Sequence, residues 1–183
     1  MSLLVAGLPW LEGRTIAVVR VRDAVASDHA GVLALNNGAV PHVNELAHDA
    51  FAWIVAHADY FRVVEDDGGI AGFVIALGAG VDYWSLNYLW FMAHGGDFLY
   101  LDRIVVAERA RGTGVGRALY DDIDRFAGGR WPCITLEVNL VPPNPGSLAF
   151  HERMGFQRVG VLETDDGTKA VALMERAVTS ASS

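Results

Sequence analysis

The chain has 183 residues, 52% of them hydrophobic and 20% charged, and its formal net charge is −8 at pH 7. This size fits one domain with a substantial core. The acidic excess, with Lys169 as the one lysine, argues against nucleic acid or an anionic membrane as a partner, because both bind clustered Lys and Arg.

No feature of the sequence favours secretion or membrane insertion. The N-terminal apolar run lacks a basic region and contains Pro9, so it is a poor secretion signal. No uncharged run is long enough to span a bilayer. One cysteine, Cys133, cannot form an internal disulfide, and we expect it to be a buried small residue. We therefore expect a cytoplasmic protein with one domain over residues 1–178 and a disordered tail over 179–183.

The first part of the chain predicts a strand, two helices and a hairpin. The strand is rich in β-branched residues, and Ser27 and Asn44 are candidate N-caps of the two helices. The second helix carries an apolar stripe that ends at His57, which we expect to be a satisfied core residue. An Asp-Asp-Gly-Gly turn joins the last two strands as an antiparallel hairpin. These elements are expected at 15–21, 27–37, 44–57, 61–65 and 70–77.

The segment 81–97 is the hardest to assign, because its aromatic residues follow neither the period of a strand nor that of a helix. A long aromatic connection of this kind is often a lid or a binding loop. We expect it to border a binding cleft; the alternatives are an insert that packs into the core or a dimer interface. Its aromatic residues are Tyr83, Trp84, Tyr88, Trp90 and Phe91.

A strand, a glycine-spaced loop and a helix follow between residues 100 and 126. Apolar residues predict the strand over Leu101–Val106, and the loop Arg111–Gly116 reads Arg-Gly-Thr-Gly-Val-Gly. Apolar residues then recur at helical spacing as far as Phe126, so a helix begins near Gly114. Glycines at such a junction let the backbone approach a ligand, and the free N–H groups of a first helical turn bind phosphate.

The spacing of this loop excludes two common phosphate-binding motifs. A P-loop requires a Lys-Ser or Lys-Thr pair, which the chain lacks, and the dinucleotide fingerprint fails because Arg117 stands where its third glycine should be. The remaining pattern, Arg-x-x-Gly-x-Gly over Arg111–Gly116, resembles the acetyl-CoA pyrophosphate loop of the GNAT superfamily of N-acyltransferases. The alternative is a tight glycine turn that binds nothing.

The C-terminal part supplies a second signature. The stretch Asn144–Phe156 resembles the GNAT pattern Asn-x-x-Ala-x-x-x-Tyr-x-x-x-Gly-Phe, with Asn144, Ser147, Gly155 and Phe156 at the family's positions. The two signatures occur in the family's order with a strand between them, so the resemblance is strong over residues 100–160. The elements expected here are a strand at 132–138, a helix at 147–154, and a closing hairpin of 156–162 with 169–177.

The resemblance implies an α+β fold, a GNAT-like mixed sheet of about seven mostly antiparallel strands, flanked by about four helices. The sheet is splayed at the cleft for acetyl-CoA, the implied co-substrate, and a homodimer is possible. No metal site is expected. Tyr83, Trp84, Tyr88 and Trp90 would then border the acceptor side. The residues implied in CoA binding are Ile104, Val105, Val106, Arg111, Gly112, Thr113, Gly114, Val115, Gly116, Arg117, Asn144 and Ser147.

The resemblance also implies the catalytic groups. His151 stands where the family has the tyrosine that protonates the leaving thiolate, and histidine is able to serve because it titrates near neutral pH; alternatively it only fills space. The attacking amine must lose a proton, for which Glu137 and Asp102 compete as the base. Alternation along the strand sets Glu137 opposite to Leu136 but leaves open which face is the cleft.

The leading interpretation is transfer of an acetyl group from acetyl-CoA to a primary amine, by direct attack in a ternary complex. The acceptor would be a small-molecule amine or a protein N-terminus. The first alternative is a module that binds acyl-CoA as a sensor or structural ligand without turnover, and the second is a dimerising structural protein. The sequence does not choose among acceptors, because a fold does not determine a substrate.

Overall fold

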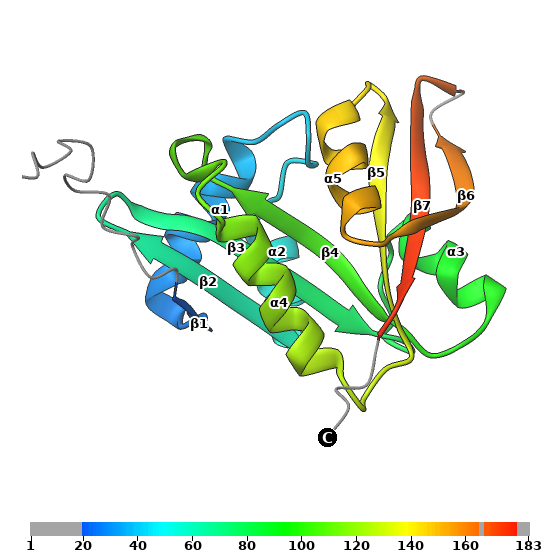
Figure 1. Ribbon diagram of the computed structural model, residues 1–183, viewed down its shortest axis with the longest axis horizontal. Coiled ribbons are helices and arrows are strands. Elements are labelled where there is room, and N and C mark those ends of the chain that lie inside the picture. The colour runs from blue at the N-terminus through cyan, green and yellow to red at the C-terminus, as the bar shows by residue number, and fades with distance from the viewer. Residues whose placement is uncertain (1–19, 165–166, 179–183) are drawn as a thin grey trace, which may run out of the picture.

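The computed structural model describes residues 20–164 and 167–178. Within these residues the chain forms seven strands and five α-helices (Figure 1). Short 3-10 turns, Ala26–Asp28 and Glu108–Ala110, precede α1 and follow β4. In chain order the elements are β1 (Val21–Asp23), α1 (His29–Asn37), α2 (His48–His57), β2 (Tyr60–Asp66), β3 (Gly69–Gly78), α3 (Leu86–His94), β4 (Leu99–Val106), α4 (Val115–Ala127), β5 (Cys133–Val141), α5 (Pro145–Arg153), β6 (Gln157–Thr164) and β7 (Lys169–Ala177).

The strands form one open sheet in the order β1-β2-β3-β4-β5-β7-β6. Every neighbouring pair is antiparallel except β4 and β5, which are parallel. This mixed, mostly antiparallel sheet confirms the predicted fold class. Most of the predicted strand at 15–21, the tail at 179–183 and part of the last turn lie outside the described residues.

Each face of the sheet packs against its own set of helices. One core cluster joins α4 and α5 to side chains such as Leu101, Leu136 and Val138. The other joins α1, α2 and α3 to side chains such as Phe73 and Tyr100. Figure 1 shows α4 and α5 in front of the sheet and α1 and α2 behind it. The face that a strand residue occupies therefore decides which of the two helical layers it meets.

The aromatic segment contains a helix that sequence periodicity did not predict. In α3, Tyr88 and Phe91 are buried against the sheet, but Leu86, Leu89 and Met92 on the outer side are also apolar and exposed. Because both sides of this helix are apolar, the sequence lacks the contrast that marks an amphipathic helix. The expectation that this segment has no regular structure is wrong, and its Ser85 caps the helix by accepting from the N–H of Tyr88.

A second correction concerns the end of α2. His57 is exposed rather than a core residue; its ring stacks on Trp53 at 3.9 Å between centroids, and Nδ1 lies 2.8 Å from the Trp53 carbonyl oxygen. The helix ends at His57, and the next residue, Ala58, has an extended backbone. No helix in the described part of the chain is long and apolar enough to cross a membrane.

Candidate active site

The sheet splits between β4 and β5. These parallel strands pair only at Leu99 with Ile134 and at Tyr100 with Thr135, and then diverge (Figure 1). On β4 the pairing with β3 skips Asp102, since Ala76 pairs with Leu101 and Ile75 with Arg103. Such a bulge bends a strand and redirects its side chains. The split leaves residues of both strands facing a gap in the sheet, as the sequence predicted for the cleft.

The glycine loop lies at the far end of β4 and starts α4 as predicted. Gly112 has φ +74° and Gly114, the N-cap of α4, has φ +97°, in the left-handed region that favours glycine. A Cβ at either position would meet no neighbouring atom, so these glycines are required by backbone conformation and leave the surface open. The first turn of α4, from Val115, thus presents its N–H groups without a side chain on the N-cap. This arrangement suits an anionic group.

The β4 backbone beside this loop is free on one side. Ile104, Val105 and Val106 pair with β3, whereas the pairing of β4 with β5 has already ended at Tyr100. An extended ligand that follows the split from the loop would therefore meet backbone N–H and C=O groups of β4. The residues expected to hold a pantetheine arm and those expected to hold a pyrophosphate lie along one path.

Glu137 lies on β5 beside the split and belongs to the face covered by α3. Leu136 packs with the α4 and α5 layer, whereas the Glu137 Oε2 atom accepts a hydrogen bond of 2.7 Å from Tyr100, a residue of the opposite layer. Burial raises the pKa of Glu137 to about 7, and the Tyr100 hydrogen bond and the nearby Asn87 amide oppose this rise. A carboxyl group that titrates near neutral pH is suited to accept a proton.

Asp102, the other candidate base, lies on β4 across the split and is also enclosed. Its side chain is 5% exposed, and Oδ1 accepts a hydrogen bond of 2.7 Å from Tyr83. Oδ2 lies 3.1 Å from Nε of Arg103. Burial raises the pKa of Asp102, while the Arg103 charge lowers it. Asp102 thus accepts a hydrogen bond from Tyr83 and forms an ion pair with Arg103, whereas Glu137 forms no ion pair within the described residues and is the better candidate base.

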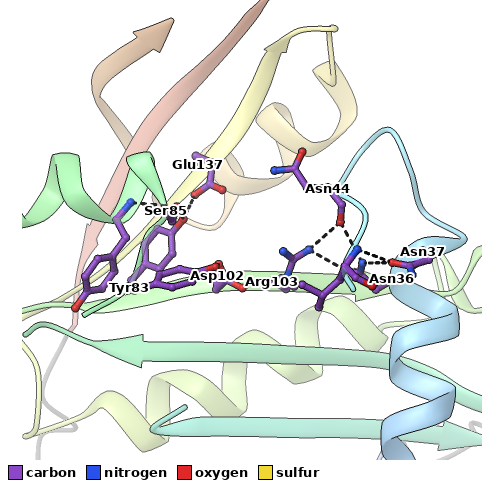
Figure 2. A network of polar contacts seen from close by, with 11 residues as sticks. Asn36, Asn37, Asn44, Tyr83, Ser85, Asp102, Arg103 and Glu137 are labelled. Carbon is purple, nitrogen blue, oxygen red and sulfur yellow. Dashed lines mark hydrogen bonds and ion pairs between the residues drawn. The ribbon is translucent and has the colours of Figure 1, made fainter. Parts of the chain in front are cut away.

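The connection between α1 and α2 forms the end wall of this space (Figure 2). Arg103 Nη1 donates to Asn36 Oδ1 and to the Asn44 carbonyl oxygen, both at 3.0 Å. Asn37 exchanges two hydrogen bonds with the backbone of Leu46, of 3.1 and 2.9 Å. Asn139 of β5 reaches the Pro41 and His42 carbonyls at 3.4 and 3.5 Å. Figure 2 shows Glu137, Asp102 and Arg103 between two groups of side chains, Tyr83 with Ser85 on one side and Asn36, Asn37 and Asn44 on the other.

A comparison of the chain with protein-family models shows which family has this site. The model of the acetyltransferase (GNAT) family matches residues 30–156, which include both strands of the split and the glycine loop. The chain belongs to the GNAT acetyltransferase family. It is therefore an N-acetyltransferase with acetyl-CoA as its co-substrate, as the two sequence signatures predicted.

Solved acetyltransferases share this fold. The ribosomal-protein-S18-alanine N-acetyltransferase of Escherichia coli is 18% identical, with 89% of this chain and 96% of that chain covered and a TM-score of 0.66. Arabidopsis thaliana NAA60 with a bisubstrate analogue is 19% identical, with 87% and 97% covered and a TM-score of 0.68. An N-acetyltransferase from Staphylococcus aureus Mu50 is 20% identical, with 88% and 99% covered and a TM-score of 0.65. A search of curated protein sequences gave no significant match.

In this acetyltransferase the helix α5 carries the second signature. Asn144 caps α5 by accepting from the Ser147 N–H at 3.2 Å, and Pro145 occupies the first turn. Arg111 and Arg117 are exposed beside the loop, and Arg117 pairs with Asp121 at 2.7 Å. Thr113 donates to the Ala110 carbonyl oxygen at 2.7 Å, which fixes the loop. The CoA-binding roles of these side chains remain predictions, whereas their parts in forming the loop and the helix are visible.

His151, which stands in place of the family's tyrosine, is 5% exposed and has partners on both ring nitrogens. Nδ1 lies 2.8 Å from the Ser147 carbonyl oxygen, so it carries the hydrogen, and Nε2 accepts from the Tyr120 hydroxyl at 2.7 Å. Burial lowers the pKa of His151, so the imidazole is neutral near pH 7. The side chain ties α5 to α4, and an acid role would require it to leave one of these partners.

The aromatic residues of the acetyltransferase divide into two groups. Tyr83 binds Asp102, and Trp84 is 54% exposed beside it, 4.7 Å from Trp53 of α2 between ring centroids. Tyr88 is fully buried, and its hydroxyl donates to the Gly78 carbonyl and accepts from the Val81 N–H. Trp90 packs against Gly160 of β6. Tyr83 thus lies beside Asp102 with Trp84 next to it on the surface, whereas Tyr88 and Trp90 belong to α3 and pack within the fold.

Sequence reasoning missed the polar wall of the site. Asn36, Asn37, Arg103 and Asn139 were not singled out, because each lies within an ordinary helix or strand pattern and they meet only in the fold. Tyr100 was also missed, since its apolar surroundings on β4 suggest a core residue. The one local signal was the connection Pro41–Asn44, whose backbone carbonyls and amides have no neighbouring strand to bind and so require side-chain partners.

Proposed function

We propose that the acetyltransferase moves an acetyl group from acetyl-CoA to a primary amine by direct attack in a ternary complex, with Glu137 as the base. The observation that supports this most is the position of Glu137, a carboxyl group with a pKa of about 7 at the split between β4 and β5. Acetyl-CoA supplies the acetyl group as a thioester. The glycine loop Gly112–Gly116 and the free side of Ile104–Val106 would hold its pyrophosphate and pantetheine arm.

Protons and charges balance in this proposal. The acceptor arrives as an ammonium ion, and Glu137 Oε1 or Oε2 takes one of its protons, directly or through a water. The neutral nitrogen lone pair then forms the C–N bond as the C–S bond breaks. The nitrogen loses its second proton and the departing thiolate takes up one proton, so the net proton released is the one that Glu137 accepted. Holding the amine against the thioester supplies most of the acceleration, and the base adds about a hundred- to ten-thousandfold.

The departing sulfur takes its proton either from His151 or from solvent. His151 as the acid remains a prediction, and it requires the imidazole to be released from Tyr120 or from Ser147. Asp102 remains the alternative base, although its two oxygens face Tyr83 and Arg103. The acceptor is a small-molecule amine or a protein N-terminus, and Tyr83 with Trp84 would contact its body.

The experiment is a screen of primary amines and short peptides with acetyl-CoA, read by the acetylated product in mass spectrometry and by release of free CoA. The proposal predicts acetylated product from at least one acceptor class, and CoA release that depends on the acceptor. Release of CoA with no acetylated product, or no turnover while acetyl-CoA binds in calorimetry, would contradict it. The second outcome would favour a module that binds acyl-CoA without turnover.

Location and oligomeric state stay predictions. We propose a cytoplasmic protein, and a homodimer would use the exposed apolar side of α3, where Leu86 is 60% and Leu89 is 46% exposed. Sedimentation equilibrium measures this directly. A protein that stays monomeric at high concentration, with Leu86→Glu unchanged in behaviour, would contradict the dimer.

A further inference from the structure

Arg103 is a nearly buried cation on β4, beside the split. Its side chain is 10% exposed, and it follows the bulged residue Asp102 on β4. A guanidinium carries five N–H donors in a fixed plane. Nη1 uses its donors on Asn36 Oδ1 and the Asn44 carbonyl oxygen, both at 3.0 Å. This end of the group holds the connection between α1 and α2.

The rest of the Arg103 guanidinium forms one ion pair and leaves Nη2 uncommitted. Nε lies 3.1 Å from Asp102 Oδ2, yet neither atom has a hydrogen-bond partner, so the contact is an ion pair without hydrogen-bond geometry. Nη2 forms no hydrogen bond with any residue in 20–164 or 167–178. Nη2 is not among the buried side-chain atoms that lack a partner, so water or a ligand can reach it. A guanidinium donor that is accessible and uncommitted beside the split is a candidate recognition group.

Arg103 and Glu137 lie on the same face of the sheet, on the two strands at either side of the split. The last paired residues are Tyr100 and Thr135, so Asp102 and Glu137 lie at the same distance beyond the pairing. The charges of Asp102 and Arg103 both act on the Glu137 carboxyl group, which places the three groups around one space (Figure 2). An acceptor whose amine lies at Glu137 brings the atoms next to that amine toward Arg103.

The charges of the site restrict what Arg103 can bind. Asp102 already neutralises Arg103, and ionised Glu137 is matched by the incoming ammonium ion. A carboxylate on the acceptor would add a negative charge near two others, which is unfavourable where water is excluded. A neutral carbonyl oxygen accepts a hydrogen bond from Nη2 without adding charge. In an α-amino amide this oxygen is separated from the amine only by the Cα and carbonyl carbons.

We propose that Arg103 binds a neutral carbonyl oxygen of the acceptor, so that the acceptor is an α-amino amide: an aminoacyl amide or the first residue of a peptide. This inference rests on the proposed function, because it requires the amine to lie at Glu137. Arg103 then determines specificity without taking part in proton transfer. Free amino acids and simple alkylamines are the poorer acceptors, the first because of charge and the second because they leave Nη2 without a partner.

The test compares four acceptors that share one carbon skeleton at the amine: L-alaninamide, a tripeptide with N-terminal alanine, L-alanine and isopropylamine. Values of kcat/KM are expressed per neutral amine, because the amine pKa differs among them. We expect alaninamide and the tripeptide to exceed isopropylamine and alanine by about tenfold or more. A kcat/KM for the tripeptide far above that for alaninamide would indicate that the acceptor is a polypeptide rather than a small aminoacyl amide. Equal values for alaninamide and isopropylamine, or a preference for alanine, would overturn the inference.

Variants separate recognition from support of the fold. Arg103→Met should bring the ratio of alaninamide to isopropylamine toward one, whereas Asn36→Ala loosens the same wall but should keep the ratio. Asp102→Asn removes the repelling charge and should raise the value for alanine relative to alaninamide. An unchanged ratio in Arg103→Met would mean that Arg103 only supports the wall. If Arg103→Met does not fold, the wild-type acceptor series and Asp102→Asn still decide.

The two proposals fail differently. If the wild-type protein acetylates none of the four acceptors nor any other amine, the proposed function is wrong. If it acetylates isopropylamine as well as alaninamide, the proposed function stands and the role of Arg103 is wrong.

Discussion

Replacing Tyr100 by Phe removes one hydrogen bond from Glu137 and little else. The Tyr100 hydroxyl donates to Glu137 Oε2 at 2.7 Å and has Ser85 Oγ at 3.4 Å as its other polar neighbour. Burial raises the pKa of Glu137 to about 7, and the hydrogen bond from Tyr100 is the largest opposing effect, ahead of Asn87 and Arg103; the charge of Asp102 adds to the rise. Without the hydroxyl, the ionised form of Glu137 loses its best donor.

The size of the effect follows from the strength of that bond. A hydrogen bond to a charged group contributes about 1.5–3 kcal/mol, and one pKa unit corresponds to about 1.36 kcal/mol. The pKa of Glu137 should therefore rise by about one to two units in Tyr100→Phe. Because the base acts only when deprotonated, activity falls as pH falls through this pKa. At pH 7 the rate should drop about 5- to 50-fold and recover above pH 9.

The assay is kcat/KM between pH 5.5 and 10, plotted as the ratio of variant to wild type, since the titration of the acceptor amine is common to both. Tyr88→Phe is the matched control, because its hydroxyl is equally buried but serves Gly78 and Val81. The ratio should rise with pH for Tyr100→Phe and stay flat for Tyr88→Phe. A flat ratio for Tyr100→Phe would refute Glu137 as the titrating base.

Three further predictions concern the loop, the base and the histidine. Gly114→Val should weaken acetyl-CoA binding at least about tenfold, measured by calorimetry. Gly129→Val, also at positive φ, should lower the stability of the fold through backbone strain but leave acetyl-CoA affinity unchanged. Equal affinity in both variants would contradict the loop assignment. Because the pKa of Glu137 is raised from 4.5 to about 7, its ionisation lowers the stability of the fold as pH rises from about 4.5 through 7. Glu137→Gln should therefore gain about 3 kcal/mol in denaturant unfolding at pH 8 and little at pH 4. If His151 is the acid, His151→Phe should lower kcat with little change in acetyl-CoA affinity. His151→Tyr should keep activity, and the alkaline limb of its pH–rate profile should move to higher pH. Full kcat in His151→Phe would mean that His151 is not the acid and only forms its hydrogen bond with Tyr120.

The elements with a clear local signal were predictable from the sequence. The glycine loop and α4 were placed correctly because their signals are local: glycines stand where the backbone adopts positive φ, and the helix has apolar residues on one side only. The hairpin of β2 and β3 followed from its turn residues. The helix α3 was not predictable from periodicity, because Leu86 and Leu89 make its solvent side as apolar as its buried side.

The site itself depended on contacts between distant segments. Alternation on β5 separated Glu137 from Leu136, but both faces of the strand are covered by helices, so only the fold shows that Glu137 meets Tyr100. In the asparagine wall, residues 36 and 44 contact residue 103, which is far from them in the sequence. No local sequence pattern predicts a contact of that range. The position of His151 in the second signature was visible in the sequence, whereas its neutral state follows from Tyr120 and from burial.

The most direct test of Glu137 as the base is the single-turnover rate of Glu137→Gln with saturating acetyl-CoA and the best acceptor of the amine screen. Glu163→Gln, an exposed carboxylate on β6, is the matched control, and acetyl-CoA affinity is measured for both. The proposed mechanism predicts a loss of about a hundred- to ten-thousandfold at pH 7.5 in Glu137→Gln, with acetyl-CoA affinity unchanged. A Glu137→Gln variant that transfers acetyl groups within a few-fold of the wild-type rate would contradict it.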